Sequence, residues 1–118
     1  MHELGIAEAT LDAVRKESAR YPNTRVVRVG LRIGELAGID ASALQFAFEA
    51  IVQGTEFETL HLEIESCPQK RKCKDCGLDF VVRNYDPQCP DCHGLHCSCI
   101  GGDELDLAFV EVEEYAAS

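Results

Sequence analysis

Hydrophobic positions in the first part of the chain recur at helical spacing in two places. Near the start, apolar residues return every three or four positions, which predicts an amphipathic helix that ends near Pro22, because proline cannot continue a helix. The residues of this stripe are Leu4, Ala7, Leu11 and Val14. The same spacing predicts a second helix between Asp40, a favoured N-cap residue, and Gly54. Its apolar residues are Leu44, Ala47, Phe48 and Ile51.

Strict alternation of apolar and polar residues predicts three half-buried strands. The apolar faces of these strands are Val27, Val29, Leu31 and Ile33; Leu60, Leu62 and Ile64; and Leu105, Leu107 and Phe109. In the last strand the alternation then slips to Val110 and Val112, so we expect a β-bulge near 108–110. Residues 101–115 are too short to fold alone, and their apolar face therefore needs the sheet formed by the first two strands.

Cysteines and charges divide the 118-residue chain into three parts. All seven cysteines lie between Cys67 and Cys99, while residues 1–66 carry 11 acids and 6 bases and residues 101–118 carry 6 acids and no base. An odd, clustered set of cysteines favours metal ligation in a reducing compartment over a secreted disulfide scaffold. We therefore expect an α+β fold, in which a small three-stranded sheet with two helices receives an inserted cysteine module. The expected boundaries are 1–66, 67–100 and 101–118.

Overall charge and hydropathy exclude several classes of partner. The formal net charge of −10 argues against nucleic acid and anionic membranes, since both attract a basic face. No run approaches the roughly 18–20 apolar residues of a membrane span, and the first residues do not resemble a secretion signal. We therefore expect a cytoplasmic protein.

Four of the cysteines have the spacing of a metal site. Cys73 and Cys76 form one C-x2-C pair, Cys89 and Cys92 form another, and 12 residues separate the pairs. Two such pairs place four thiolates around one ion, which is the closed geometry of structural zinc. Segment 78–82, which lies between the two pairs, is predicted to form a short strand. The module is therefore expected to be a zinc ribbon. A rubredoxin-like iron site uses similar pairs and stays open as an alternative.

The remaining cysteines and nearby histidines have no decisive spacing. They are Cys67, Cys97, Cys99, His93 and His96. One interpretation is that they are bystander thiols and loop histidines beside the ribbon. The other is that His96, or the pair of Cys97 and Cys99, supplies a ligand to a second, transient metal. The sequence alone does not decide between them.

The N-terminus combines several metal ligands within a few atoms. Met1 is expected to be retained because His2 is large, which leaves an α-amine, the His2 amide and imidazole, and the Glu3 carboxylate close together. Such a nitrogen-rich set suits nickel or copper. The alternative is that His2 is a frayed terminal residue and Glu3 is a first-turn acid favoured by the helix dipole.

The combination of these motifs resembles the HypA/HybF family of nickel metallochaperones. The resemblance rests on the opening Met1-His2-Glu3-Leu4, the segments 32–35 and 44–49, the two C-x2-C pairs and the segment 102–105. It covers essentially the whole chain. The pair of Cys97 and Cys99 after His96 is a departure, because it is not a hallmark of the family. It leaves open an alternative zinc shell or an auxiliary nickel ligand.

This resemblance implies a nickel-binding domain with an inserted zinc domain. Nickel would be held by the α-amine of Met1, by His2 and nearby backbone nitrogen, with Glu3 contributing, and Cys73, Cys76, Cys89 and Cys92 would be the zinc ligands. The implied partners are the GTPase HypB of the same pathway and the large subunit of [NiFe]-hydrogenase; some members also serve urease. The expected activity is metal transfer, and no constellation typical of an enzyme is found. A zinc-ribbon adaptor without nickel and an iron electron-transfer protein are the competing classes.

Overall fold

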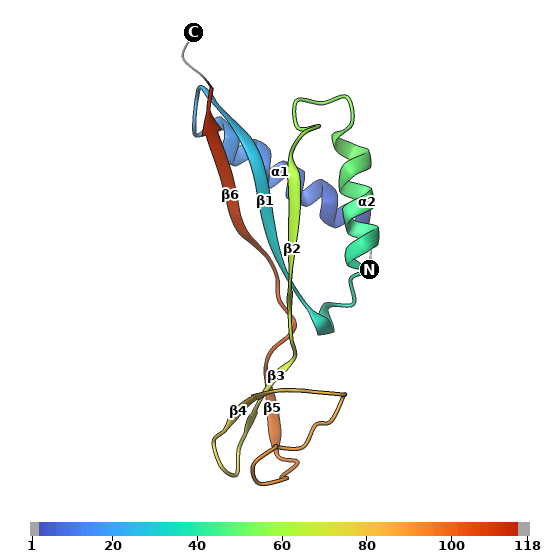
Figure 1. The fold of residues 1–118 in the computed structure, drawn as a ribbon, viewed down its shortest axis with the longest axis vertical. Coiled ribbons are helices and arrows are strands. Elements are labelled where there is room, and N and C mark those ends of the chain that lie inside the picture. Colours follow the sequence, from blue (N-terminus) through green and yellow to red (C-terminus); the bar gives the residue numbers. More distant parts are fainter. Residues whose placement is uncertain (1–2, 116–118) are drawn as a thin grey trace. The chain divides into compact units, whose positions relative to one another are not determined.

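The computed structural model describes residues 3–115, which form two compact units (Figure 1). Among the described residues, one unit contains 3–32, 38–65 and 106–115, and we call it the helix–sheet unit. The other contains 33–37 and 66–105, and we call it the ribbon unit. The predicted α+β class is confirmed, because both helices and two small sheets are present. Neither described helix is long and apolar enough to cross a membrane.

The helix–sheet unit is built around a three-stranded sheet. Its elements are α1 (Glu3–Ala19), β1 (Thr24–Gly34), α2 (Ala41–Val52), β2 (His61–Cys67) and β6 (Leu105–Glu114), of which β1 and β2 end just inside the ribbon unit. The strand order is β2-β1-β6, so the last strand of the chain lies beside the first. Figure 1 shows α1 passing behind the strands, and α2 packs against α1. The final strand therefore completes a sheet that the first part of the chain begins, as predicted.

The buried stripe of α1 differs from the prediction at its first residue. Ala7, Leu11 and Val14 are buried, but Leu4 is 52% exposed. Thr10 is buried instead, and its hydroxyl donates a hydrogen bond of 2.8 Å to the carbonyl of Ile6. The hydroxyl is satisfied within its own helix, so its burial carries little penalty.

Helix α2 begins and ends as its sequence predicts. Asp40 is the N-cap, and its Oδ1 accepts a hydrogen bond of 3.0 Å from the N–H of Ala43. Its buried residues are Leu44, Phe48 and Val52. Beyond the helix, Gly54 has a φ of 75°, a left-handed conformation that glycine adopts without strain.

Strand β1 buries residues in a less regular pattern than its alternation predicts. Val29, Leu31 and Ile33 are buried, but so is Val26, while Val27 is only half-buried. Val26 and Val29 are three positions apart, so the alternation slips by one residue between them. Arg25, before the slip, and Arg32, after it, both pair with acidic residues of β6.

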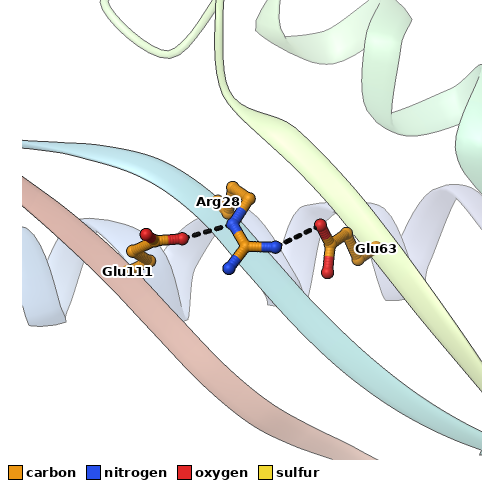
Figure 2. Close-up of polar contacts among 3 residues, drawn as sticks. All are labelled: Arg28, Glu63 and Glu111. Carbon is orange, nitrogen blue, oxygen red and sulfur yellow. Dashed lines mark hydrogen bonds and ion pairs between the residues drawn. The ribbon is translucent and has the colours of Figure 1, made fainter.

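Those pairs show that β1 and β6 run antiparallel. Arg25 contacts Glu113 and Arg32 contacts Asp106, so the partner number falls as the β1 number rises. Figure 2 shows Arg28 between two carboxylates on the face turned away from α1. Its Nη1 lies 2.5 Å from Oε1 of Glu63 on β2, and its Nε contacts Glu111 on β6. The hydrogen bonds that Arg28 donates, first to Glu111 and then to Glu63, raise the pKa of Arg28, and one guanidinium joins all three strands.

Phe109 of β6 lies on this same open face. Its ring centroid is 5.2 Å from the guanidinium carbon of Arg28, and a Cβ placed on Gly30 would lie 2.2 Å from the ring. Gly30 therefore provides the space in which the ring sits. The start of β6 is less buried than predicted, because Leu105, Leu107 and Phe109 are 42%, 39% and 37% exposed. Beyond the predicted slip, Val110 and Val112 are half-buried.

The ribbon unit contains a second three-stranded sheet of order β4-β3-β5. Its strands are β3 (Lys70–Cys73), β4 (Asp79–Val81) and β5 (Cys97–Gly101), with β3 antiparallel to both neighbours. The predicted strand between the cysteine pairs is β4. Strands β3 and β5 were not predicted from the sequence, because their residues are mostly charged, small or thiol-bearing.

Glycines allow backbone segments of the ribbon unit to meet closely. A Cβ on Gly34 would lie 2.0 Å from the carbonyl oxygen of Gly102, and only glycine fits there. The same carbonyl accepts a hydrogen bond of 2.6 Å from the N–H of Leu36, in the short helix η1 (Glu35–Ala37). The N–H of Gly34 donates to the carbonyl of Glu104 at 2.8 Å. These hydrogen bonds attach residues 33–37 to the rest of the ribbon unit.

Candidate metal centre

The four cysteines of the two C-x2-C pairs converge in the ribbon unit. Their sulfur atoms all lie within 4.8 Å of one another; Sγ of Cys73 is 3.6 Å from Sγ of Cys92, and Sγ of Cys76 is 3.5 Å from Sγ of Cys89. Four sulfurs bound at about 2.3 Å to a tetrahedral ion are about 3.8 Å apart. The cluster therefore has the dimensions of a four-thiolate metal site.

The first turn of each pair has the same backbone geometry. The N–H of Gly77 donates to the carbonyl of Cys73, and the N–H of His93 donates to the carbonyl of Cys89, both at 2.9 Å. Gly77 and His93 also both have positive φ, of 80° and 62°. Each pair is thus a tight turn that directs two side chains to one point, and the two turns face each other.

Backbone amides of these turns hydrogen-bond to the sulfur atoms. The amides of Cys76 and Asp75 bond to Cys73, and the amide of Leu78 bonds to Cys76. In the second turn, the amide of Gly94 bonds to Cys92. Amide donors stabilise thiolates. No sequence pattern indicated a role for Gly94. A Cβ at this position would lie 3.2 Å from the Cys92 sulfur, so a residue without a side chain fits best.

Without a cation the cluster does not ionise as four thiolates. Hydrogen bonds from the amides of Cys76 and Asp75 lower the pKa of Cys73 to about 6. The pKa of Cys76 rises to about 12 despite the amide of Leu78, because Cys89 lies beside it and the cluster is partly desolvated. The first negative charge thus opposes further ones. A divalent cation removes this conflict, so metal binding and proton release are coupled.

The donor set fits a closed, structural metal ion. Four thiolates complete a tetrahedron and leave no position for a substrate or water. Cys73 and Cys89 are fully buried, whereas Cys76 and Cys92 are exposed, so the cluster lies at the surface of the ribbon unit. Zinc and iron both match four sulfur ligands of this arrangement.

The other candidate ligands near the ribbon do not form a second cluster. Nδ1 of His96 lies 3.5 Å from Oδ2 of Asp75, and both side chains are exposed. Cys99 is exposed and its thiol donates to the carbonyl of Gly101, while Cys97 is half-buried. Among residues 3–115, the four clustered cysteines are the only group of three or more histidine, cysteine or acidic side chains whose ligand atoms lie close enough to hold one ion.

The predicted nickel ligands lie mostly outside the described residues. Met1 and His2 precede residue 3, and Glu3 is the first residue of α1 and an acid in its first turn. A carboxylate at this position is favoured by the positive end of the helix dipole. The four zinc ligands predicted from the sequence, in contrast, come together in one cluster.

Comparison with known proteins points to one family. The model of the HypA family, described as "Hydrogenase/urease nickel incorporation, metallochaperone, hypA", matches residues 1–112. The chain has the fold of the "Solution structure of the Ni metallochaperone HypA from Helicobacter pylori", with a TM-score of 0.64 at 24% identity, covering 98% of this chain and 100% of that one. A structure described as "Solution structure of HypA protein" aligns with a TM-score of 0.68 over 94% and 95% of the two chains.

Full-length relatives agree with the family model. The chain is 38% identical to hydrogenase maturation factor HypA of Acidithiobacillus ferrooxidans over 113 residues, which cover 96% of this chain and 100% of the relative. It is 33% identical to hydrogenase maturation factor HybF of Escherichia coli, with the same coverage of both chains. With the match to residues 1–112, these similarities show that the chain belongs to the HypA/HybF family of hydrogenase maturation factors.

Proposed function

We propose that this protein is a nickel metallochaperone that binds Ni(II) at its N-terminus and delivers it to the large subunit of a [NiFe]-hydrogenase. The observation that supports this most strongly is the family match over residues 1–112, whose description names nickel incorporation. The ligands are the α-amine of Met1, the backbone and imidazole nitrogens of His2, and the carboxylate of Glu3. Such nitrogen-rich sets suit the planar geometries that nickel adopts.

A terminal site has the properties that transfer of a metal requires. Its ligands come from a few adjacent residues, so a recipient protein can approach the ion and replace them one at a time. The cysteine cluster has the opposite character, because its four thiolates fill the coordination shell. We therefore assign nickel at the terminus as the cargo and zinc at Cys73, Cys76, Cys89 and Cys92 as the resident structural ion.

The function needs partners but no chemical catalysis by this chain. In this proposal the GTPase HypB of the same pathway assists loading, and the hydrogenase large subunit receives the nickel in the cytoplasm. Urease maturation proteins are a second class of recipient, since the family description names both enzymes. The helix–sheet unit carries the cargo site, because Glu3 begins its first helix.

Calorimetric titration with nickel tests the site directly. Untagged protein is compared with a form that has one extra glycine before Met1, which moves the α-amine away from His2 and changes no side chain. We expect the extended form to lose nickel binding while metal analysis still finds one zinc. Equal binding by both forms would place nickel elsewhere. Binding by neither form would favour a zinc-ribbon adaptor, and iron at the cysteines would favour electron transfer.

A further inference from the structure

A fifth thiol lies against the four-cysteine cluster. Strands β3 and β5 are antiparallel, and Cys97 on β5 lies directly opposite Cys73 on β3. Residues directly opposite in an antiparallel pair point to the same face, with Cβ atoms about 4.5–5.5 Å apart. Cys97 therefore approaches the cluster from the position next to one of its buried members, although it belongs to neither C-x2-C pair.

The surroundings of Cys97 hold its thiol at the edge of the cluster. Its Sγ lies 3.7 Å from the carbonyl oxygen of Gly94, and the N–H of the same glycine bonds to the sulfur of Cys92. Cys97 thus contacts the loop that positions the second pair and lies opposite the buried Cys73.

Cys99 provides a useful contrast on the same strand. It is exposed, and its thiol donates to the carbonyl of Gly101 at 3.2 Å. Its strand partner is Arg71, which is not one of the four clustered cysteines. Two cysteines that are two residues apart therefore differ in their relation to the metal site, and only Cys97 faces a ligand across the sheet.

We propose that Cys97 is a reserve ligand that replaces Cys73, so that the ion is then held by Cys76, Cys89, Cys92 and Cys97. The proposal rests on the four-cysteine metal site assigned above. When Cys97 binds, its thiol releases one proton to the solvent and forms one sulfur–metal bond, while the bond between Cys73 and the metal breaks and the departing Cys73 thiolate takes up one proton. The metal then keeps four thiolates, its charge balance and its tetrahedral geometry. The ribbon unit retains its ion when Cys73 is lost.

Cobalt substitution of the full chain counts the thiolates in each variant. Sulfur-to-cobalt charge-transfer absorption grows with the number of bound thiolates, so four can be distinguished from three. We expect wild type and Cys73→Ser to show equal intensity, because Cys97 takes the vacant position. The matched control Cys76→Ser and the double variant Cys73→Ser/Cys97→Ser should each lose about a quarter of it, as expected for three of four sulfur ligands.

The outcomes separate this proposal from the assignment of the site itself. A wild-type chain without four-thiolate absorption would refute the metal site. A four-thiolate wild type with equal losses in Cys73→Ser and Cys76→Ser would refute the reserve ligand and leave the site intact.

A second measurement does not require the Cys73 variant to fold. Zinc transfer from the full chain to an excess of chelator is timed for Cys97→Ser and for the control Cys99→Ser. Serine keeps a hydroxyl that can donate to the carbonyl of Gly94 but is a poor zinc ligand, so the hydrogen bond and the ligand role are separated. We expect zinc loss several-fold faster for Cys97→Ser and unchanged for Cys99→Ser. Wild-type rates in both variants would overturn the proposal.

Discussion

The helix–sheet unit and the ribbon unit bury different kinds of side chain. The first encloses aliphatic and aromatic residues from both helices and the sheet, among them Phe48, Leu44 and Val29. In the 66–105 segment of the second, the residues in the buried apolar set are Cys73 and Cys89, each 0% exposed. One unit is therefore stabilised by apolar area removed from water, and the other by what its thiols bind. The same chain uses two sources of stability.

Removal of the metal should produce the largest difference in stability between the two units. Structural zinc contributes on the order of 10 kcal/mol to the folding of small metal modules, and residues 66–105 bury little else. We expect a chelator to collapse the NMR shift dispersion of amides in this segment, while amides of α1 and α2 keep theirs. Dispersed ribbon signals without metal would contradict the comparison, and re-addition of zinc should restore the native spectrum.

Truncation of the apolar core should give the reverse pattern. Phe48 is 1% exposed, and replacing a buried phenylalanine by alanine costs about 3–5 kcal/mol. We expect Phe48→Ala to lower the free energy of unfolding of the helix–sheet unit by this amount, as measured in urea, with unchanged cobalt absorption. Phe46 lies on the same helix and is 74% exposed, so Phe46→Ala should change stability by less than about 0.5 kcal/mol. Similar losses in both variants would show that the unit is not stabilised by its core.

Acid should distinguish the two metals. The α-amine and imidazole bind nickel only when deprotonated, and their usual pKa values are about 7.7–8 and 6.5. Nickel affinity should therefore fall through this range, by about tenfold for each pH unit below one pKa and more steeply below both. Titrations between pH 8 and pH 6 should show this loss, while the ribbon cysteines retain their zinc. Flat nickel affinity over this range would exclude the terminal ligands.

The same contrast explains which elements were predictable from the sequence. Both helices and the three strands of the first sheet were predicted, because a repeated apolar face indicates a helix or strand. Burial followed this face less well in β6, where Leu105, Leu107 and Phe109 are exposed. Strands β3 and β5 were missed, since Lys70–Cys73 and Cys97–Gly101 carry no alternating apolar face. These two strands pair where the two C-x2-C pairs come together. That convergence depends on backbone turns. The four clustered cysteines were nevertheless predicted from spacing alone.

Individual burial depends on neighbours that periodicity does not describe. Leu4 continues the stripe of α1 but is half exposed, while Thr10 is buried at little penalty, since its hydroxyl bonds within the helix. Cys97 had no assignable role from spacing, because its relation to Cys73 exists only through the register of β3 and β5. Such contacts join residues far apart in the chain, and a pattern along the sequence contains no information about them.

The smallest predicted effect tests whether local signals in the helix–sheet unit act independently of its core. Asp40 caps α2 through a bond of 3.0 Å from the N–H of Ala43. Asp40→Ala removes this acceptor and should lower the free energy of unfolding by about 1 kcal/mol. Asp40→Asn keeps an acceptor oxygen at the same place and should retain most of that stability. Because the cap is exposed and the core is untouched, combining Asp40→Ala with Phe48→Ala should give nearly additive losses in urea. A clearly smaller combined loss would mean that the cap acts by positioning Phe48, and the core would then depend on the helix start.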